Sequence, residues 1–96
     1  MLHYLFLSFA PGYFTEEIYA FASQCFGRLP DEESYIRNVI VKKNCVVRDG
    51  NMDLMVIMEM ENEASLKSYL DCRLHKQFVS VVGDHVVTKI AFDCFI

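Results

Sequence analysis

Apolar residues at the start of the chain follow first a strand pattern and then a helix pattern. Residues 2–9 are rich in aromatic and branched side chains and stop at Pro11–Gly12, which predicts a strand. Thr15 is a suitable helix N-cap, and two glutamates occupy the first turn after it. A helix over about 15–28 is predicted by apolar residues at helical spacing, with Pro30 ending the pattern: Ile18, Phe21, Ala22, Cys25, Phe26 and Leu29.

The middle and the end of the chain have strand composition. Residues 35–48 are rich in β-branched side chains and predict a long second strand. Asp49–Gly50, followed by asparagine, tolerates the positive φ of a hairpin turn, so residues 52–60 are expected to form an antiparallel third strand. Residues 86–96 form the predicted last strand.

The segment between residues 62 and 82 is helical but is expected to break. Asn62 can cap a short helix ending at Leu70, with Leu66, Tyr69 and Leu70 facing inward. Asp71 is the candidate N-cap of a further helix, whose apolar stripe is Leu74, Phe78, Val81 and Val82. On an unbroken helix, six positions leave two side chains roughly 120° apart. Tyr69 and His75 can therefore face one site only if the helix breaks between them.

The element order β-α-β-β-α-β predicts an α+β fold of the ferredoxin-like type, with a four-stranded antiparallel sheet and helices on one face. The 96 residues are enough for one hydrophobic core, so we predict a single domain over 1–96.

Both faces of the predicted sheet are apolar. In the first strand His3, Leu5, Leu7 and Phe9 alternate with Leu2, Tyr4, Phe6 and Ser8, and the third strand shows a similar pattern. Two helical regions can cover only one face, and monomers rarely expose an apolar patch of several hundred Å². The sequence therefore predicts a homodimer in which the second faces pack together.

Composition excludes several classes of protein. A chain that is 53% hydrophobic is unlike a disordered protein, and a net charge of −4 gives no positive surface for nucleic acid. Residues 2–9 lack a basic segment and a cleavage site and are too short to span a bilayer, so we expect a cytoplasmic protein without a membrane segment. No C-x-x-C spacing favours zinc, and we expect four reduced, mostly buried cysteines: Cys25, Cys45, Cys72 and Cys94.

Three short stretches resemble the stress-responsive A/B barrel family, often called Dabb. These are the histidine-led apolar run H3-Y-L-F-L-S-F9, the spacing Y69-L-D-C-R-L-H75, and I90-A-F-D93 near the end. Cys72 stands where many members have a histidine, and Arg73 replaces the proline that commonly breaks the helix. These departures weaken any expectation of a metal site.

The resemblance implies a dimeric α+β barrel with a cavity between each sheet and its own helices. One plant member closes a polyketide ring with a tyrosine and a histidine and without a cofactor. By position, that pair is Tyr69 and His75, with His3 lining the same cavity. We assign Leu5, Leu7 and Phe78 to the lining that contacts the ligand, and we expect no cofactor and no metal.

The role of the pair stays open at this stage. Tyr69 and His75 could act on a carbonyl compound, could contact a ligand without chemistry, or could be structural, with His75 bonded to a backbone carbonyl across the break. His3 is more typical of a satisfied core polar group than of a base. His85 is expected in an exposed turn, and Asp93 is expected to pair with Lys89 or a helix end.

The leading functional hypothesis is a small dimer that holds an apolar carbonyl compound between sheet and helices, as a cofactor-free cyclase, lyase or isomerase. One alternative is a non-catalytic stress or assembly protein whose cavity is filled with side chains. Another is a monooxygenase of the related dimeric α/β barrel group.

Overall fold

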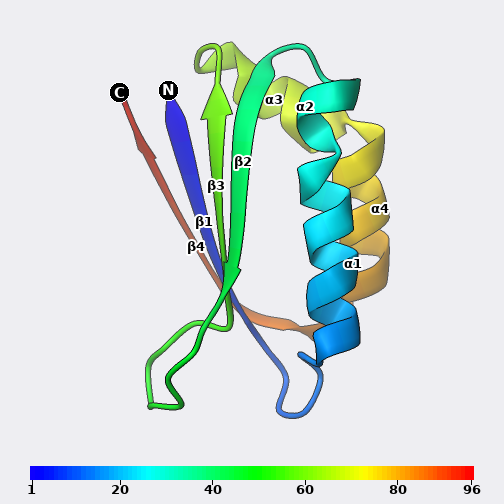
Figure 1. Cartoon of the computed structure of the whole chain (residues 1–96), viewed down its shortest axis with the longest axis vertical. Helices are drawn as coiled ribbons and strands as arrows, with labels where there is room; N and C mark the ends of the chain where they lie inside the picture. Colours follow the sequence, from blue (N-terminus) through cyan, green and yellow to red (C-terminus); the bar gives the residue numbers. More distant parts are fainter.

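A four-stranded antiparallel sheet forms one layer of the structure, and the helices form the other (Figure 1). The structure, a computed structural model, describes residues 1–96. The elements in chain order are β1 (Leu2–Phe9), α1 (Glu16–Gly27), α2 (Leu29–Glu32), β2 (Ile36–Lys43), β3 (Leu54–Met60), α3 (Ala64–Asp71), α4 (Arg73–Val82), the 3-10 turn η1 (Gly83–His85) and β4 (Val86–Cys94). The strand order is β2-β3-β1-β4. The predicted ferredoxin-like α+β fold is confirmed.

The hydrophobic core lies between the sheet and the helices. Alternate residues of β1 and β3 are buried against the helices, which is the period expected when one face of a sheet packs on a second layer. The helices contribute a complementary set to the same buried cluster: Ala22, Cys25, Phe26, Leu74, Phe78 and Val82. Each fully buried large side chain stabilises the fold by about 1.5–3 kcal/mol.

The connection between β2 and β3 departs from the predicted tight hairpin. β2 ends at Lys43, although the predicted strand extends to residue 48, and residues 46 and 47 are exposed valines. The side-chain amides of Asn44 and Asn51 donate to the Val46 carbonyl, at 2.6 and 3.2 Å. Such local bonds compete with strand pairing, and no layer covers the valines here. Gly50 does adopt the predicted positive φ, at 86°.

Helix ends follow the predicted caps only in part. Thr15 Oγ1 accepts a hydrogen bond from the Ile18 backbone N–H at 3.3 Å, which confirms Thr15 as the N-cap of α1. The prediction for Asn62 is one residue off, because Glu63 occupies the N-cap position of α3 and Asn62 lies before it. Asn62 still contributes, since its Oδ1 accepts from Ser65 Oγ at 3.5 Å.

Two side chains predicted to face inward are exposed. Val81 is 45% exposed because the buried stripe of α4 follows i, i+4 spacing through Leu74, Phe78 and Val82, and Val81 lies about 60° from the centre of that stripe. Leu70 is also largely exposed, although it borders the cavity described below.

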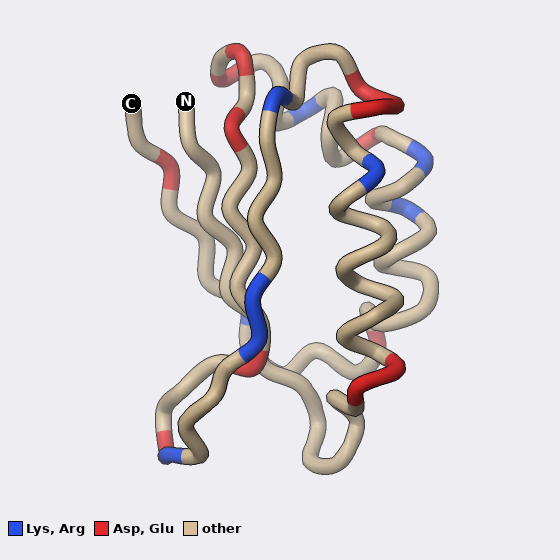
Figure 2. Tube along the Cα trace, viewed as in Figure 1, with Lys and Arg blue, Asp and Glu red and all other residues tan.

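The second face of the sheet has no covering layer within the chain (Figure 1). Phe92 and Ile90 of β4 are 60% and 48% exposed, and the ring of Tyr4 packs edge-on against Phe92 at 6.1 Å. Their neighbours on this face include further apolar residues: Leu2, Phe6, Ile40, Met55 and Ile57. Most charged residues lie instead on the helices, the turns and the strand ends (Figure 2). We name the apolar residues of this second face the open sheet face: Leu2, Tyr4, Phe6, Ile40, Met55, Ile57, Ile90 and Phe92.

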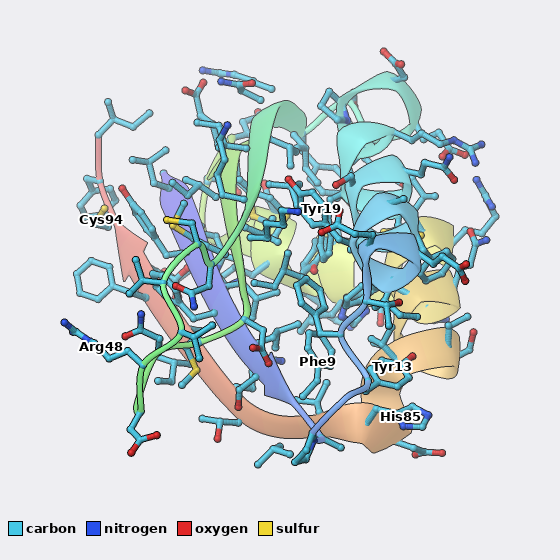
Figure 3. The ribbon with its side chains drawn as sticks, turned by 60° about the horizontal axis from the view of Figure 1, so that its bottom comes forward. Phe9, Tyr13, Tyr19, Arg48, His85 and Cys94 are labelled. Carbon is cyan, nitrogen blue, oxygen red and sulfur yellow. The ribbon has the colours of Figure 1, made fainter.

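An aromatic stack joins the loop between β1 and α1 to the turn η1. The rings of Tyr13 and His85 lie face to face, with centroids 3.9 Å apart and planes 8° apart (Figure 3). The Tyr13 hydroxyl donates to the Val81 carbonyl at 3.3 Å. His85 is exposed in the turn η1, as predicted.

All four cysteines are free. Cys25 and Cys72 are buried, Cys94 is half-buried, and Cys45 is exposed, so the expectation of mostly buried thiols holds for two of them. A membrane span would need a longer and more apolar helix than any in this chain.

Candidate functional site

The helix breaks at Cys72, one residue after the predicted position. Cys72 has an extended backbone (φ −75°, ψ 157°), and its Sγ accepts a hydrogen bond from the His75 backbone N–H at 3.5 Å. Cysteine thus takes the N-cap role that serine usually fills. Asp71, the predicted cap, is instead the last residue of α3 and pairs with Lys67 at 3.1 Å. The helix therefore breaks here without a proline, and Arg73, which stands at the usual position of that proline, is the first residue of α4.

The break brings Tyr69 and His75 together. Their ring centroids are 4.7 Å apart and the rings meet edge to face at 62°. The ring of His3, on β1, lies 6.1 Å from that of Tyr69. Three rings from three different elements therefore gather at one place.

These rings form part of the wall of a cavity of about 470 Å³ between the sheet and helices α3 and α4. This volume falls within the range of small-molecule sites. The cavity brings together all six residues that the sequence predicted for the site: His3, Leu5, Leu7, Tyr69, His75 and Phe78. The lining also contains Leu66, Leu70, Val79, Val82, Gly83, Val86, Lys89 and Ala91. Ten of the fourteen lining residues are hydrophobic, so the space suits a largely apolar molecule.

His75 is held as a neutral base. Its Nδ1 lies 3.1 Å from the Leu70 carbonyl oxygen, which can only accept, so Nδ1 carries a hydrogen, and in the neutral ring Nε2 then keeps the lone pair. Burial lowers the pKa of His75 below its ordinary value, and the positive charge of Lys89 lowers it further. The Leu70 hydrogen bond opposes this shift without reversing it. The backbone bond expected for a structural histidine is therefore present, and it also orients the ring.

The protonation of His75 gives a direct pH prediction. In an NMR titration of the histidine ring protons, we expect His75 to titrate below pH 6.5. The unfolded chain takes up this proton at higher pH, so the contribution of His75 makes the fold less stable as pH falls through about 6.5. The variant His75→Gln assigns the resonance and should remove this part of the pH dependence. A midpoint above 6.5 would contradict the neutral state.

Tyr69 is a protonated hydrogen-bond donor. Only 2% of the residue is exposed, and this burial raises the pKa of the phenol well above its ordinary value. Negative charge on Cys72 or Tyr35 would raise it further. The phenol thus keeps its proton throughout the pH range in which proteins are stable.

Asp93 pairs with His3, not with Lys89 or a helix end as the sequence suggested. The β1–β4 register places the two residues opposite each other, and His3 Nδ1 lies 2.5 Å from Asp93 Oδ1. His3 is buried, so the expectation of a core-facing, satisfied histidine holds. Lys89, one of the two expected partners of Asp93, enters none of the five ion pairs of the chain.

Sequence reasoning missed three residues on the sheet side of the cavity, Val86, Lys89 and Ala91, all on β4. Lys89 and Ala91 alternate with the exposed Ile90 and Phe92, so strand period alone places them on the same face as Asp93. Only the pairing of β4 with β1 shows that this face is the one beneath the helices.

Comparison with solved structures supports the fold. A dimeric protein of unknown function and ferredoxin-like fold from Bacteroides fragilis superposes with a TM-score of 0.80 at 16% identity, over 95% of this chain and 90% of that chain. A hydroxynitrile lyase from Passiflora edulis gives a TM-score of 0.74 at 7% identity, over 95% and 87%. A Dabb family protein with a ferredoxin-like fold from Mesorhizobium loti gives 0.73 at 14% identity, over 99% and 94%.

The curated protein sequences contain no match to this chain. The model of the stress responsive A/B barrel domain matches residues 1–96, the whole length given. Together with the broken helix and the Tyr69–His75 pair, this match establishes that the chain belongs to the stress-responsive A/B barrel family.

Proposed function

We propose that this protein acts as a homodimer that binds an apolar carbonyl compound in the cavity and moves a proton at the carbon next to the carbonyl, without a cofactor. This step is common to cyclases, lyases acting on carbonyl compounds, and isomerases. The observation that carries the proposal is a neutral imidazole, His75, fixed by the Leu70 carbonyl at the wall of an apolar cavity beside the phenol of Tyr69.

The chemistry follows from the two protonation states. His75 Nε2 takes a proton from the α carbon, and the electrons of that C–H bond form a carbon–carbon double bond. The carbonyl π electrons move to oxygen, where the Tyr69 hydroxyl donates a hydrogen bond to the developing charge. Return of the proton to carbon completes exchange or isomerisation. Attack by the enolate carbon on a second carbonyl of the same molecule closes a ring instead, and the alkoxide formed at that carbonyl takes the proton from His75.

The homodimer is proposed from the open sheet face. Phe92, Ile90 and Tyr4 form part of an apolar surface that a second copy would cover, with each sheet facing the other. The similar Bacteroides fragilis protein is described as dimeric.

The four free cysteines fit a reducing compartment, and we place the protein in the cytoplasm on that ground.

The cavity volume bears on the assembly alternative. A purely structural assembly protein is expected to fill this space with side chains, whereas about 470 Å³ stays open here. This favours a binding function. The monooxygenase alternative differs in requiring oxygen, so an oxygen-free assay separates it from proton transfer.

The test uses 2-tetralone, an apolar aromatic ketone, in D2O without oxygen. Proton NMR follows loss of the α-proton signal as deuterium enters. We expect the protein to accelerate exchange above the buffer rate, and Ala91→Phe, which fills the cavity from its sheet side, to remove the acceleration. Ala20→Phe places the same side chain on the exposed face of α1 and should leave the rate unchanged. Exchange at the buffer rate, or equal rates for wild type and Ala91→Phe, would refute the proposal.

A further inference from the structure

Lys89 is the one lysine, arginine, aspartate or glutamate among the fourteen residues that line the cavity. It forms no ion pair, unlike Lys43 and Lys67, which pair with Glu16 and Asp71. A cation bordering an apolar space without a counter-charge from the protein leaves an electrostatic interaction open to a ligand. The positive charge of Lys89 also lowers the pKa of His75, so the two side chains lie close enough to interact electrostatically.

The β1–β4 register shows how Lys89 lies relative to His3 along the sheet side of the cavity. Asp93 is paired with His3, Ala91 with Leu5, and Lys89 with Leu7. Four residues along a strand span about 13 Å, so the sheet side of the cavity is polar at two separated positions. Between them lie the small side chain of Ala91 and its partner Leu5, and Leu7 lies beside Lys89. The cavity therefore offers a polar end at His3, which Asp93 binds from outside the lining, an apolar middle, and a cation near the other end.

We propose that Lys89 selects ligands that carry a carboxylate on an apolar body, with the ammonium paired to the carboxylate. The inference rests on the proposed function and refines its substrate class to an apolar keto acid or a similar anionic carbonyl compound. A lysine suits this role because its ammonium is a compact charge on a flexible stem that can follow a ligand. The net charge of the chain is −4, so attraction of an anion to this cavity must be local.

The preference can be measured with two probes of equal size. 2-Naphthylacetate is an anion, and 2-naphthylacetamide is its neutral counterpart; each displaces the neutral fluorophore N-phenyl-1-naphthylamine from the cavity. We expect wild type to bind the anion about tenfold or more tightly than the amide. Lys89→Met should equalise the two, and Lys89→Arg should keep the preference. Lys67→Met, on the outer surface of α3, is the control and should behave as wild type.

The outcomes separate this inference from the proposed function. If wild type binds both probes equally, or if Lys89→Met keeps the preference, the role of Lys89 is wrong while binding in the cavity stands. If the fluorophore binds but neither probe displaces it, the role of Lys89 is wrong, whereas a fluorophore that does not bind at all shows that the cavity does not take up apolar molecules, and both proposals fail. Lys89 is an exposed residue on an edge strand, so its variants should fold, which circular dichroism checks.

Discussion

Substitution of His75 by glutamine is expected to slow α-proton exchange of 2-tetralone by about 10²- to 10⁴-fold, the usual contribution of a positioned general base. The glutamine amide can still donate to the Leu70 carbonyl, so the link across the broken helix is kept. What it lacks is the basic ring nitrogen of histidine. Exchange rates from proton NMR at pH 7 compare the variant with wild type.

A control separates loss of the base from loss of the fold. Tyr69→Phe keeps the ring that packs against His75 but removes the hydroxyl, and its effect should be smaller than that of His75→Gln. Thermal unfolding of both variants shows whether the core is intact. If His75→Gln exchanges protons within threefold of wild type, His75 is a structural anchor and another group is the base.

Substitution of Phe92 by glutamate is expected to convert the proposed homodimer into a monomer. The residue lies on the open sheet face with its ring against Tyr4, and in a two-fold dimer each copy would bury a new carboxylate. Burial of an unpaired charge costs several kcal/mol, so the dissociation constant should rise by a factor of roughly 10³ or more. Light scattering after size-exclusion chromatography should give 11.1 kDa for the variant and twice that for wild type.

The matched control places glutamate on the other layer of the molecule. Val81 is exposed on α4, so Val81→Glu should stay dimeric. If Phe92→Glu keeps the wild-type mass while Val81→Glu dissociates, the copies associate through their helices. A wild-type chain that is monomeric at all concentrations would contradict the homodimer itself.

Burial of one face explains which elements the sequence could predict. β1 spans residues 2–9 as expected, because alternation is imposed by packing along the whole strand. The cap at Thr15 is equally local, since it depends on residues within one helical turn. β2 was predicted too long because propensity continues through Val46 and Val47, while asparagine side chains and the lack of a covering layer end the strand at Lys43.

The site shows the same division between local and long-range information. A helix break between Tyr69 and His75 could be predicted from Asp71 as a candidate N-cap, but the cap at Cys72 could not, because a thiol is a weak acceptor that rarely marks a helix start. Lys89, Ala91 and the partner of Asp93 depend on the register between the first and last strands of the chain. Residue spacing alone carries no information about that pairing.

The most direct test of the central claim is to locate a bound ketone. Intermolecular nuclear Overhauser effects can be recorded between 2-tetralone and the methyl groups of the labelled protein. We expect contacts from the ligand to Leu5, Ala91 and Val79, together with a shift of the His75 ring protons. Contacts confined to Ile57 and Ile90 on the open sheet face, with His75 unchanged, would contradict binding between the sheet and the helices.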